Sequence, residues 1–132
     1  MLKYISGPNY INASTIDVPI YRMAEVYLNY AEAKAELGTL TQDDLDHSVN
    51  LIRDRVGMPH LNKSAANADP DPFLTSELYG YKNVDSSPNK GVILEIRRER
   101  SIEMVSEGIR FSDLCRWREG QLLAQPFYGP YV

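Results

Sequence analysis

The sequence predicts an all-α fold in which antiparallel helix pairs are joined by long loops. Three observations indicate this class. Apolar residues recur at helical spacing in segments 19–37 and 42–56, and the same periodicity returns in segment 91–106. The connection between the first two segments, residues 38–40, is very short, so these two helices should form an antiparallel pair.

The composition is that of a globular module. The chain has 132 residues, of which 43% are hydrophobic and 24% charged, with a formal net charge of −4. These values exclude intrinsic disorder, collagen-like repeats and a strongly basic nucleic-acid binder. Cys115 is the only cysteine, so no disulfide can form within the chain. There is no run of roughly 18 apolar residues for a membrane span, and the N-terminus lacks the apolar core of a signal peptide.

The first helix is expected over residues 19–37, after an extended lead-in at residues 1–18. Asp17 ahead of Pro19 is typical of a helix start, and Gly38 is typical of a helix end. At 100° per residue, its apolar residues form two adjacent stripes and leave one narrow polar face, which predicts neighbouring helices on two sides. The stripes are Ile20, Ala24, Tyr27, Leu28, Ala31 and Ala35, and then Met23, Val26, Tyr30, Ala33 and Leu37; the polar face is Arg22, Glu25, Asn29, Glu32 and Glu36.

The remaining elements follow in order. Thr41 to Asp44 resembles a capping box and predicts the start of a second helix over 42–56. Residues 58–90 are rich in Asn, Asp, Pro and Ser, and a loop of this length is normally functional or poorly ordered. Two further helices are expected at 91–106 and 112–119.

The helix at 91–106 carries charges that cannot be satisfied locally. Glu95, Glu99, Glu103 and Glu107 are like-charge neighbours at i,i+4 spacing, and apolar residues are interleaved with the charges round the helix. Partners must therefore come from Arg110, Arg116 and Arg118 downstream, or from Arg53 and Arg55 on the second helix. We predict a structural ion-pair network in which loss of one member costs about 3 kcal/mol. Its expected members are Arg97, Arg98, Glu99, Arg100, Glu103, Glu107 and Arg110.

The same arginines could instead form a phosphate-binding strip. Residues 91–119 hold six arginines, but they also hold six carboxylates. The segment is neutral, so a nucleic acid would release few counterions on binding to it. We therefore favour the structural network and expect no nucleic-acid partner.

Three stretches together resemble the SusD/RagB family of surface nutrient-binding lipoproteins. They are PIYRMAEVYLNYAEAKAELG at 19–38, LIRDRVGMP at 51–59 and LEIRRERSIEMVSEGIRFSDLCRW at 94–117, and they cover about half of the chain. The combination of the three in this order is more specific than any one of them. The resemblance implies an α-helical fold built on tetratricopeptide-like helix pairs, of which this chain would be a part.

The resemblance also implies a function. Members of this family capture glycans or related nutrients without catalysis at the outer-membrane surface, and they pass them to a SusC-like TonB-dependent transporter. Their precursors carry a signal peptide and a lipid-bearing cysteine. We expect an N-terminal portion with that lipid anchor to be absent from this sequence. The alternative, from another class, is a helical-repeat scaffold for protein–protein interaction.

The long loop offers candidate sugar-binding residues. Tyr79, Tyr81, Asn83 and Asp85 combine aromatic faces with hydrogen-bonding groups, as sugar sites usually do. The alternative is that the tyrosines pin the loop to the helices. Trp117, by its place in the helix ending, is expected to pack in the core.

Nothing in the sequence indicates catalysis or a metal. His47 and His60 lie on different predicted elements, and no Ser/His/Asp or Cys/His signature is present. Asp69 and Asp71 provide too few oxygens for calcium by themselves. We expect a binding protein that is not an enzyme and that has no metal or cofactor.

Overall fold

The computed structural model describes residues 20–84 and 88–126, and these residues contain helices and no strand. The all-α class predicted from the sequence is confirmed, whereas tetratricopeptide-like pairing stays a prediction. The helices are α1 (Met23–Glu36), α2 (Gln42–Asp46), α3 (Val49–Arg55), α4 (Lys63–Ala68), α5 (Lys90–Glu103) and α6 (Arg110–Arg116), followed by the 3₁₀-helix η2 (Gly120–Ala124). None of the described helices is long and apolar enough to cross a membrane.

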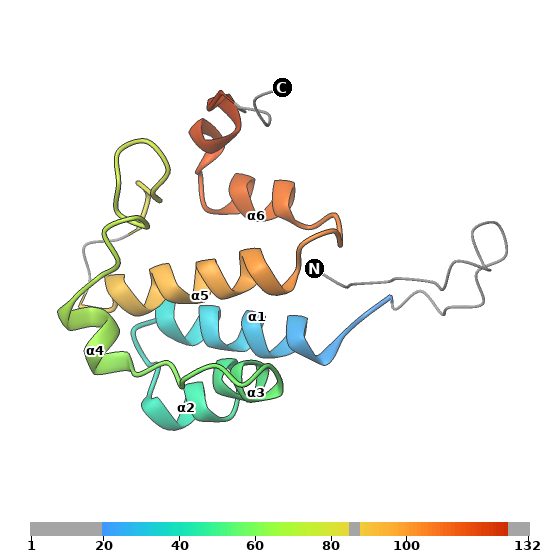
Figure 1. Ribbon diagram of the computed structural model, residues 1–132, viewed down its shortest axis with the longest axis vertical. Coiled ribbons are helices and arrows are strands. Elements are labelled where there is room, and N and C mark those ends of the chain that lie inside the picture. The colour runs from blue at the N-terminus through green and yellow to red at the C-terminus, as the bar shows by residue number, and fades with distance from the viewer. Residues whose placement is uncertain (1–19, 85–87, 127–132) are drawn as a thin grey trace, which may run out of the picture.

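Two long helices, α1 and α5, form the centre of the fold. They lie side by side and run in opposite directions (Figure 1). The short helices α2 and α3 lie on the other side of α1, while α6 lies beside α5. Helix α4 packs against α5, and Gly91 permits the close approach because a Cβ atom there would collide with the Ala66 backbone. Segments far apart in the sequence therefore meet along α5.

Helix α1 is shorter than predicted. It begins at Met23 and not at Pro19, because Arg22 has an extended backbone with φ −126° and ψ 144°. Asp17 and Pro19, the predicted start signals, lie outside the described residues. At the other end the helix stops at Glu36, and Gly38 adopts the left-handed φ of 74° that favours glycine.

The predicted second helix, 42–56, is two helices. Thr41 and Asp44 form the capping box at the start of α2. The chain then breaks at Ser48, whose hydroxyl donates to the carbonyl oxygen of Asp44 and so replaces a backbone donor. Helix α3 continues to Arg55, where Gly57 follows with a φ of 69°.

Segment 58–90 is not one irregular loop. Helix α4 occupies part of it, capped by the Asn62 side chain. Residues 69–84, which we call the turn segment, wind through consecutive turns. Helices α5 and α6 begin slightly earlier than the predicted 91–106 and 112–119, and both also end earlier, because Ser106 and Arg118 take left-handed backbone angles.

The two apolar stripes of α1 have different surroundings. Leu28, Ala31 and Ala35 of the first stripe are buried in the core with residues of α3, α5 and α6. The second stripe is largely exposed; its members are Met23, Val26, Tyr30, Ala33 and Leu37. Helix α1 nevertheless has neighbouring helices on two sides, as predicted, because α5 and α3 both contact it and the Tyr30 hydroxyl donates to Asp44 of α2. The polar face also contacts α5, because Asn29 and Glu36 accept hydrogen bonds from Arg100 and Arg97.

Candidate functional site

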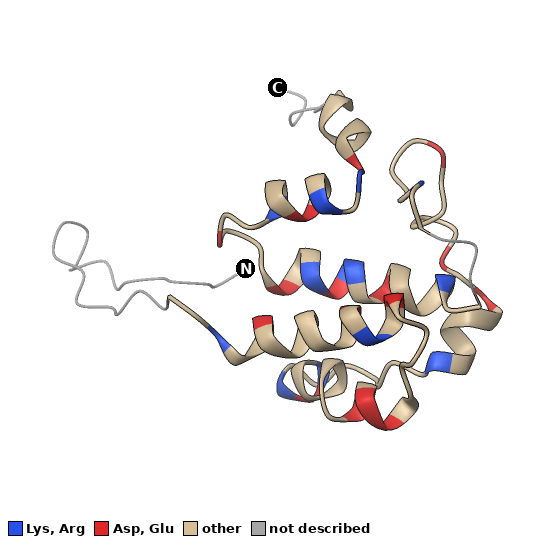
Figure 2. Cartoon of the chain, turned by 180° about the vertical axis from the view of Figure 1, so that it is seen from behind, with Lys and Arg blue, Asp and Glu red and all other residues tan. Residues whose placement is uncertain are grey.

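Ion pairs join the polar face of α1 to α5. Figure 2 shows acidic and basic segments alternating along α5, with further charges on α1 beside it. Arg22, just before α1, donates from Nη1 to Glu103 Oε1 at 2.7 Å and from Nη2 to Glu107 Oε1 at 2.6 Å. At the other end of α1, Arg97 Nη2 lies 3.3 Å from Glu36 Oε1. Ion pairs therefore close both ends of the contact, and the hydrogen bond from Arg100 to Asn29 lies between them.

A second set of ion pairs connects α3 and α6 to α5. Arg53 of α3 donates from Nε to Glu99 Oε1 at 2.8 Å, and its Nη2 lies 3.5 Å from Glu95 Oε2. Arg100 Nε donates to Asp113 Oδ2 of α6 at 2.7 Å. All five of these side chains are buried, and burial raises the pKa of the Glu95 carboxyl although Arg98 and Arg53 lie beside it.

Two buried carboxylates that the sequence did not single out connect further parts of the fold. Glu32 joins α1 to the end of α6, and Glu119 joins the residues after α6 to the turn segment. Glu32 of α1 accepts from Trp117 Nε1 at 2.6 Å and from Arg116 Nη2 at 3.1 Å. Glu119 has no exposed surface; it accepts from the backbone amides of Lys82 and Asn83 at 3.0 and 2.7 Å. A signal was present for Glu32, because the polar residues of α1 recur at the same helical spacing as the charges of α5.

Arg110 is the predicted network member whose surroundings differ. Its Nη1 donates to Ser101 Oγ at 2.7 Å and its Nη2 to the Tyr81 hydroxyl at 3.2 Å. Within residues 20–84 and 88–126, no carboxylate lies within ion-pairing distance of it, whereas Arg97, Arg98 and Arg100 each have at least one. The described residues therefore provide hydroxyl groups where the sequence predicts a carboxylate partner for Arg110.

The four predicted sugar-binding residues do not form one site. Tyr79 is 46% exposed and stacks on Phe73, with ring centroids 6.0 Å apart and planes 17° apart. Tyr81 is buried, meets Trp117 edge to face at 5.7 Å, and shares a hydrogen bond of 3.0 Å with Ser101 Oγ. Tyr81 therefore holds the turn segment against the helices, which is the role that the alternative interpretation predicted for both tyrosines.

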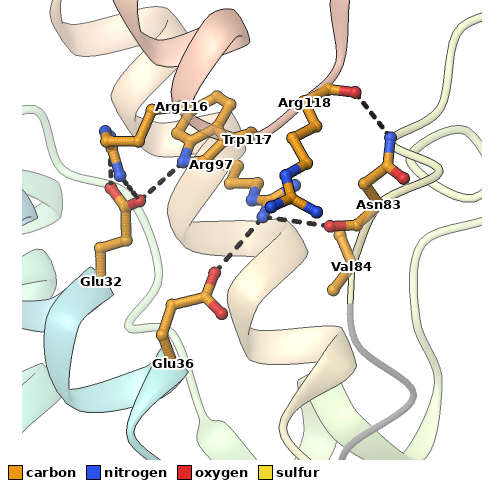
Figure 3. A pocket seen from close by; sticks show the side chains of 8 residues that line it. All are labelled: Glu32, Glu36, Asn83, Val84, Arg97, Arg116, Trp117 and Arg118. Carbon is orange, nitrogen blue, oxygen red and sulfur yellow. Dashed lines mark hydrogen bonds and ion pairs between the residues drawn. The ribbon is translucent and has the colours of Figure 1, made fainter.

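The other two predicted residues lie elsewhere. Asn83 donates from Nδ2 to the carbonyl oxygen of Arg118 at 2.7 Å. It lines a separate cavity of about 530 Å³ between α1, α5 and the residues after α6 (Figure 3). Asp85 lies outside the described residues.

The cavity in Figure 3 is lined by charges of both signs. Its arginines are Arg97, Arg116 and Arg118, and its carboxylates are Glu32 and Glu36. Because Glu32 binds Arg116 and Glu36 binds Arg97, most of this charge is satisfied internally. The cavity is therefore chiefly part of the ion-paired framework.

The two tyrosines line a different hollow, which we call the aromatic groove. It has a volume of about 340 Å³, within the range of roughly 300–1,000 Å³ that is usual for small-ligand sites. An exposed aromatic pair forms one part of it and arginine and serine side chains form the other. The lining residues are Phe73, Leu74, Tyr79, Tyr81, Arg98, Ser101, Ile102 and Arg110.

The turn segment that carries the aromatic pair is held in one conformation. The amides of Gly80 and Tyr81 donate to the carbonyl oxygens of Ser76 and Leu74, each at 2.9 Å. A Cβ atom on Gly80 would lie 2.7 Å from the Leu74 oxygen, so the turn closes only with glycine there. Together with the Glu119 contacts, these bonds hold the backbone of the turn segment on the side of the aromatic pair.

The arrangement of the aromatic groove suits binding through stacking and hydrogen bonds. The exposed rings of Phe73 and Tyr79 can cover the apolar face of a ring-shaped ligand. Arg110, Arg98 and Ser101 can donate hydrogen bonds at its edge. Within the described parts of the chain, His, Cys, Asp and Glu side chains form no group of three or more that could hold a metal ion.

Comparison with known proteins gives one match. The model of the SusD family matches residues 1–131, which is almost the entire chain. No curated protein and no solved structure matches it.

Proposed function

The chain belongs to the SusD family, and from that premise we propose that it captures a glycan or related nutrient without catalysis. In this proposal the protein acts on the outer-membrane surface, attached by a lipid anchor, and delivers the ligand to a SusC-like TonB-dependent transporter. In this proposal the described helices belong to a SusD/RagB-like domain.

The aromatic groove is the observation that supports a sugar ligand. The apolar face of a pyranose ring packs well on aromatic rings, while its hydroxyl groups require donors and acceptors nearby. Phe73 and Tyr79 are 61% and 46% exposed, although residues of this kind usually avoid water. Their exposure beside Ser101 and two arginines is what a sugar-binding surface needs.

The experiment that tests this proposal uses the full-length protein on a glycan array. A Phe73→Ala/Tyr79→Ala double variant is expected to lose about tenfold or more in affinity for the glycan, because the stacking surface is gone. Tyr21→Ala is the matched control, since Tyr21 is 85% exposed and does not line the groove. Equal affinity in wild type and double variant would contradict the role of the groove.

Delivery to a transporter needs a separate test. Pull-down from outer membranes with the full-length protein should recover a TonB-dependent transporter, and the Phe73→Ala/Tyr79→Ala variant should recover it equally well. Failure to recover a transporter would contradict the delivery step and leave glycan capture standing.

The exposed stripe of α1 supports a second candidate function. Met23, Val26 and Tyr30 present a continuous apolar surface, which in soluble proteins often marks a protein contact. In this alternative the protein is a helical-repeat scaffold with a protein ligand. Binding of a protein partner that Val26→Asp abolishes, with no glycan signal on the array, would favour the scaffold.

A further inference from the structure

The aromatic groove combines a stacking surface with a cation that no carboxylate neutralises. We propose that it selects a sugar carrying an anionic group, either a carboxylate or a sulfate ester. The apolar face of the sugar ring rests on Phe73 and Tyr79, and the anionic group binds the guanidinium of Arg110. This inference rests on the proposed glycan capture and specifies the class of glycan.

The charge of the groove is the first support. Its described lining contains two arginines and no carboxylate, in a chain whose formal net charge is −4. Arg98 is neutralised, because its Nη1 lies 2.8 Å from Asp71 Oδ2 and its Nη2 contacts Glu95. Arg110 is the lining residue that keeps an uncompensated charge.

The bonding of Arg110 is the second support. Both of its hydrogen bonds go to hydroxyl groups, those of Ser101 and Tyr81, which carry no charge. Its other N–H groups have no partner within the described residues. A carboxylate or sulfate accepts such N–H groups in pairs, and these charge-assisted bonds are stronger than neutral ones.

The position of Arg110 is the third support. Its guanidinium lies 5.7 Å from the Tyr81 ring centroid and 5.6 Å from that of Trp117. Both rings are buried, and together with the hydroxyl contacts they hold the exposed cation in place. Little conformational freedom is therefore lost when an anion binds.

The aromatic pair argues for a sugar anion over other anions. Inorganic phosphate would leave the exposed surfaces of Phe73 and Tyr79 uncovered. A nucleic acid needs several unpaired cations, and this groove supplies one. A sugar with an acidic substituent uses both the stacking surface and the guanidinium.

The test is calorimetric titration of the full-length protein with pairs of ligands that differ only in charge. Oligogalacturonate and its methyl ester share a backbone and differ in the carboxylate. A sulfated galactan oligosaccharide and its desulfated form do the same for the sulfate, so the two pairs distinguish the two anions. We expect at least one charged ligand to bind about tenfold more tightly than its neutral counterpart.

Variants of Arg110 then locate the preference. Arg110→Gln should abolish the preference for the charged ligand while the neutral ligand still binds, and Arg110→Lys should restore part of it. Arg118→Gln is the matched control: it removes the same charge from an exposed arginine that also has no carboxylate partner in the described residues and lies outside the groove. It should leave the preference unchanged.

The outcomes separate this inference from the proposed function. Equal binding of charged and neutral sugars overturns the inference and leaves glycan capture standing, whereas binding of no sugar overturns both. Equal losses in the Arg110 and Arg118 variants indicate diffuse electrostatic attraction and overturn the inference. So does preferential binding of an acidic peptide. If Arg110→Gln does not fold, the ligand pairs alone decide, because they need only the wild-type protein.

Discussion

The arginines of this protein have two kinds of surroundings. Arg53 and Arg100 are buried, and each is bonded to carboxylates from another helix. Arg110 is exposed, rests beside two aromatic rings and donates only to hydroxyl groups. The comparison teaches that the partner of an arginine, and not the residue type, decides whether it has a structural role. An arginine bound to a buried carboxylate holds helices together, whereas an arginine without a carboxylate partner remains available to bind a ligand.

Removing Arg53 should have the largest effect on the framework. An Arg53→Met variant removes the arginine bound to the buried Glu99 carboxylate and one of the two arginines beside Glu95, and it should lose about 3–5 kcal/mol of unfolding free energy. Urea unfolding measures this loss. The control is Arg55→Met, two residues along, where the arginine is 56% exposed and its pair with Glu103 should contribute about 1 kcal/mol or less. Equal losses would contradict the distinction between buried and exposed pairs.

Glu119 connects the framework to the groove, so its variant should affect both. Glu119→Gln places an amide N–H group against the donors of Lys82, Asn83 or Arg97, and we expect a loss of about 2–3 kcal/mol. Hydrogen exchange at the Lys82 and Asn83 amides should become faster. Glu77→Gln, on an exposed residue of the turn segment, should change neither quantity. Unchanged exchange in Glu119→Gln would show that the turn segment is held by other contacts.

A change confined to the turn segment should weaken the groove more than the framework. Gly80→Ala forces the chain apart because the added Cβ would lie 2.7 Å from the Leu74 oxygen, at an expected cost of about 1–2 kcal/mol. Since Tyr79 is the preceding residue, glycan affinity should fall with it. Gly120→Ala adds the same atom where nothing lies within 4 Å, and it should preserve affinity. Calorimetric titration distinguishes the two.

The smallest expected effect concerns Asp44, a carboxylate that is bound by hydroxyl and backbone amide groups and by Lys34, with no arginine beside it in the described residues. Hydrogen bonds from the Tyr30 hydroxyl and from Thr41 lower the pKa of Asp44 below its ordinary value of 3.8. The stabilisation is therefore complete above that value and is lost as the pH falls through the lowered pKa. An Asp44→Asn variant should be slightly less stable at neutral pH and should show a flatter decline in acid. A parallel decline in both proteins, followed by circular dichroism, would contradict this assignment.

The helical class could be predicted from the sequence because periodicity and caps are local. Gly38 and the Thr41 capping box occur as expected at the ends of α1 and α2. Some boundaries could not be predicted, because they depend on side-chain competition for backbone groups. Ser48 interrupts the second helix through its own hydroxyl, and nothing in the apolar spacing around it indicates this.

The candidate site was less predictable than the fold. The sequence indicated that the charged residues of α5 need ion-pair partners from other elements. It did not show that Glu32 and Glu119 would be buried carboxylates in the same network. Tyr79 and Asn83 are near in sequence and face different hollows, because the turns between them reverse the direction of the chain. Which loop side chains share a site depends on such turns, and composition does not encode them.

The alternation of charges between α1 and α5 has a consequence for how the two helices align along their axes. Apolar surfaces tolerate sliding, since one aliphatic contact replaces another at little cost. The bonds from Arg22 to Glu103, from Arg100 to Asn29 and from Arg97 to Glu36 can form together at only one axial offset. A shift by one helical turn, about 5.4 Å, would break them all at once. We therefore expect this interface to fix the axial register of α1 and α5 and to disfavour misaligned packing during folding.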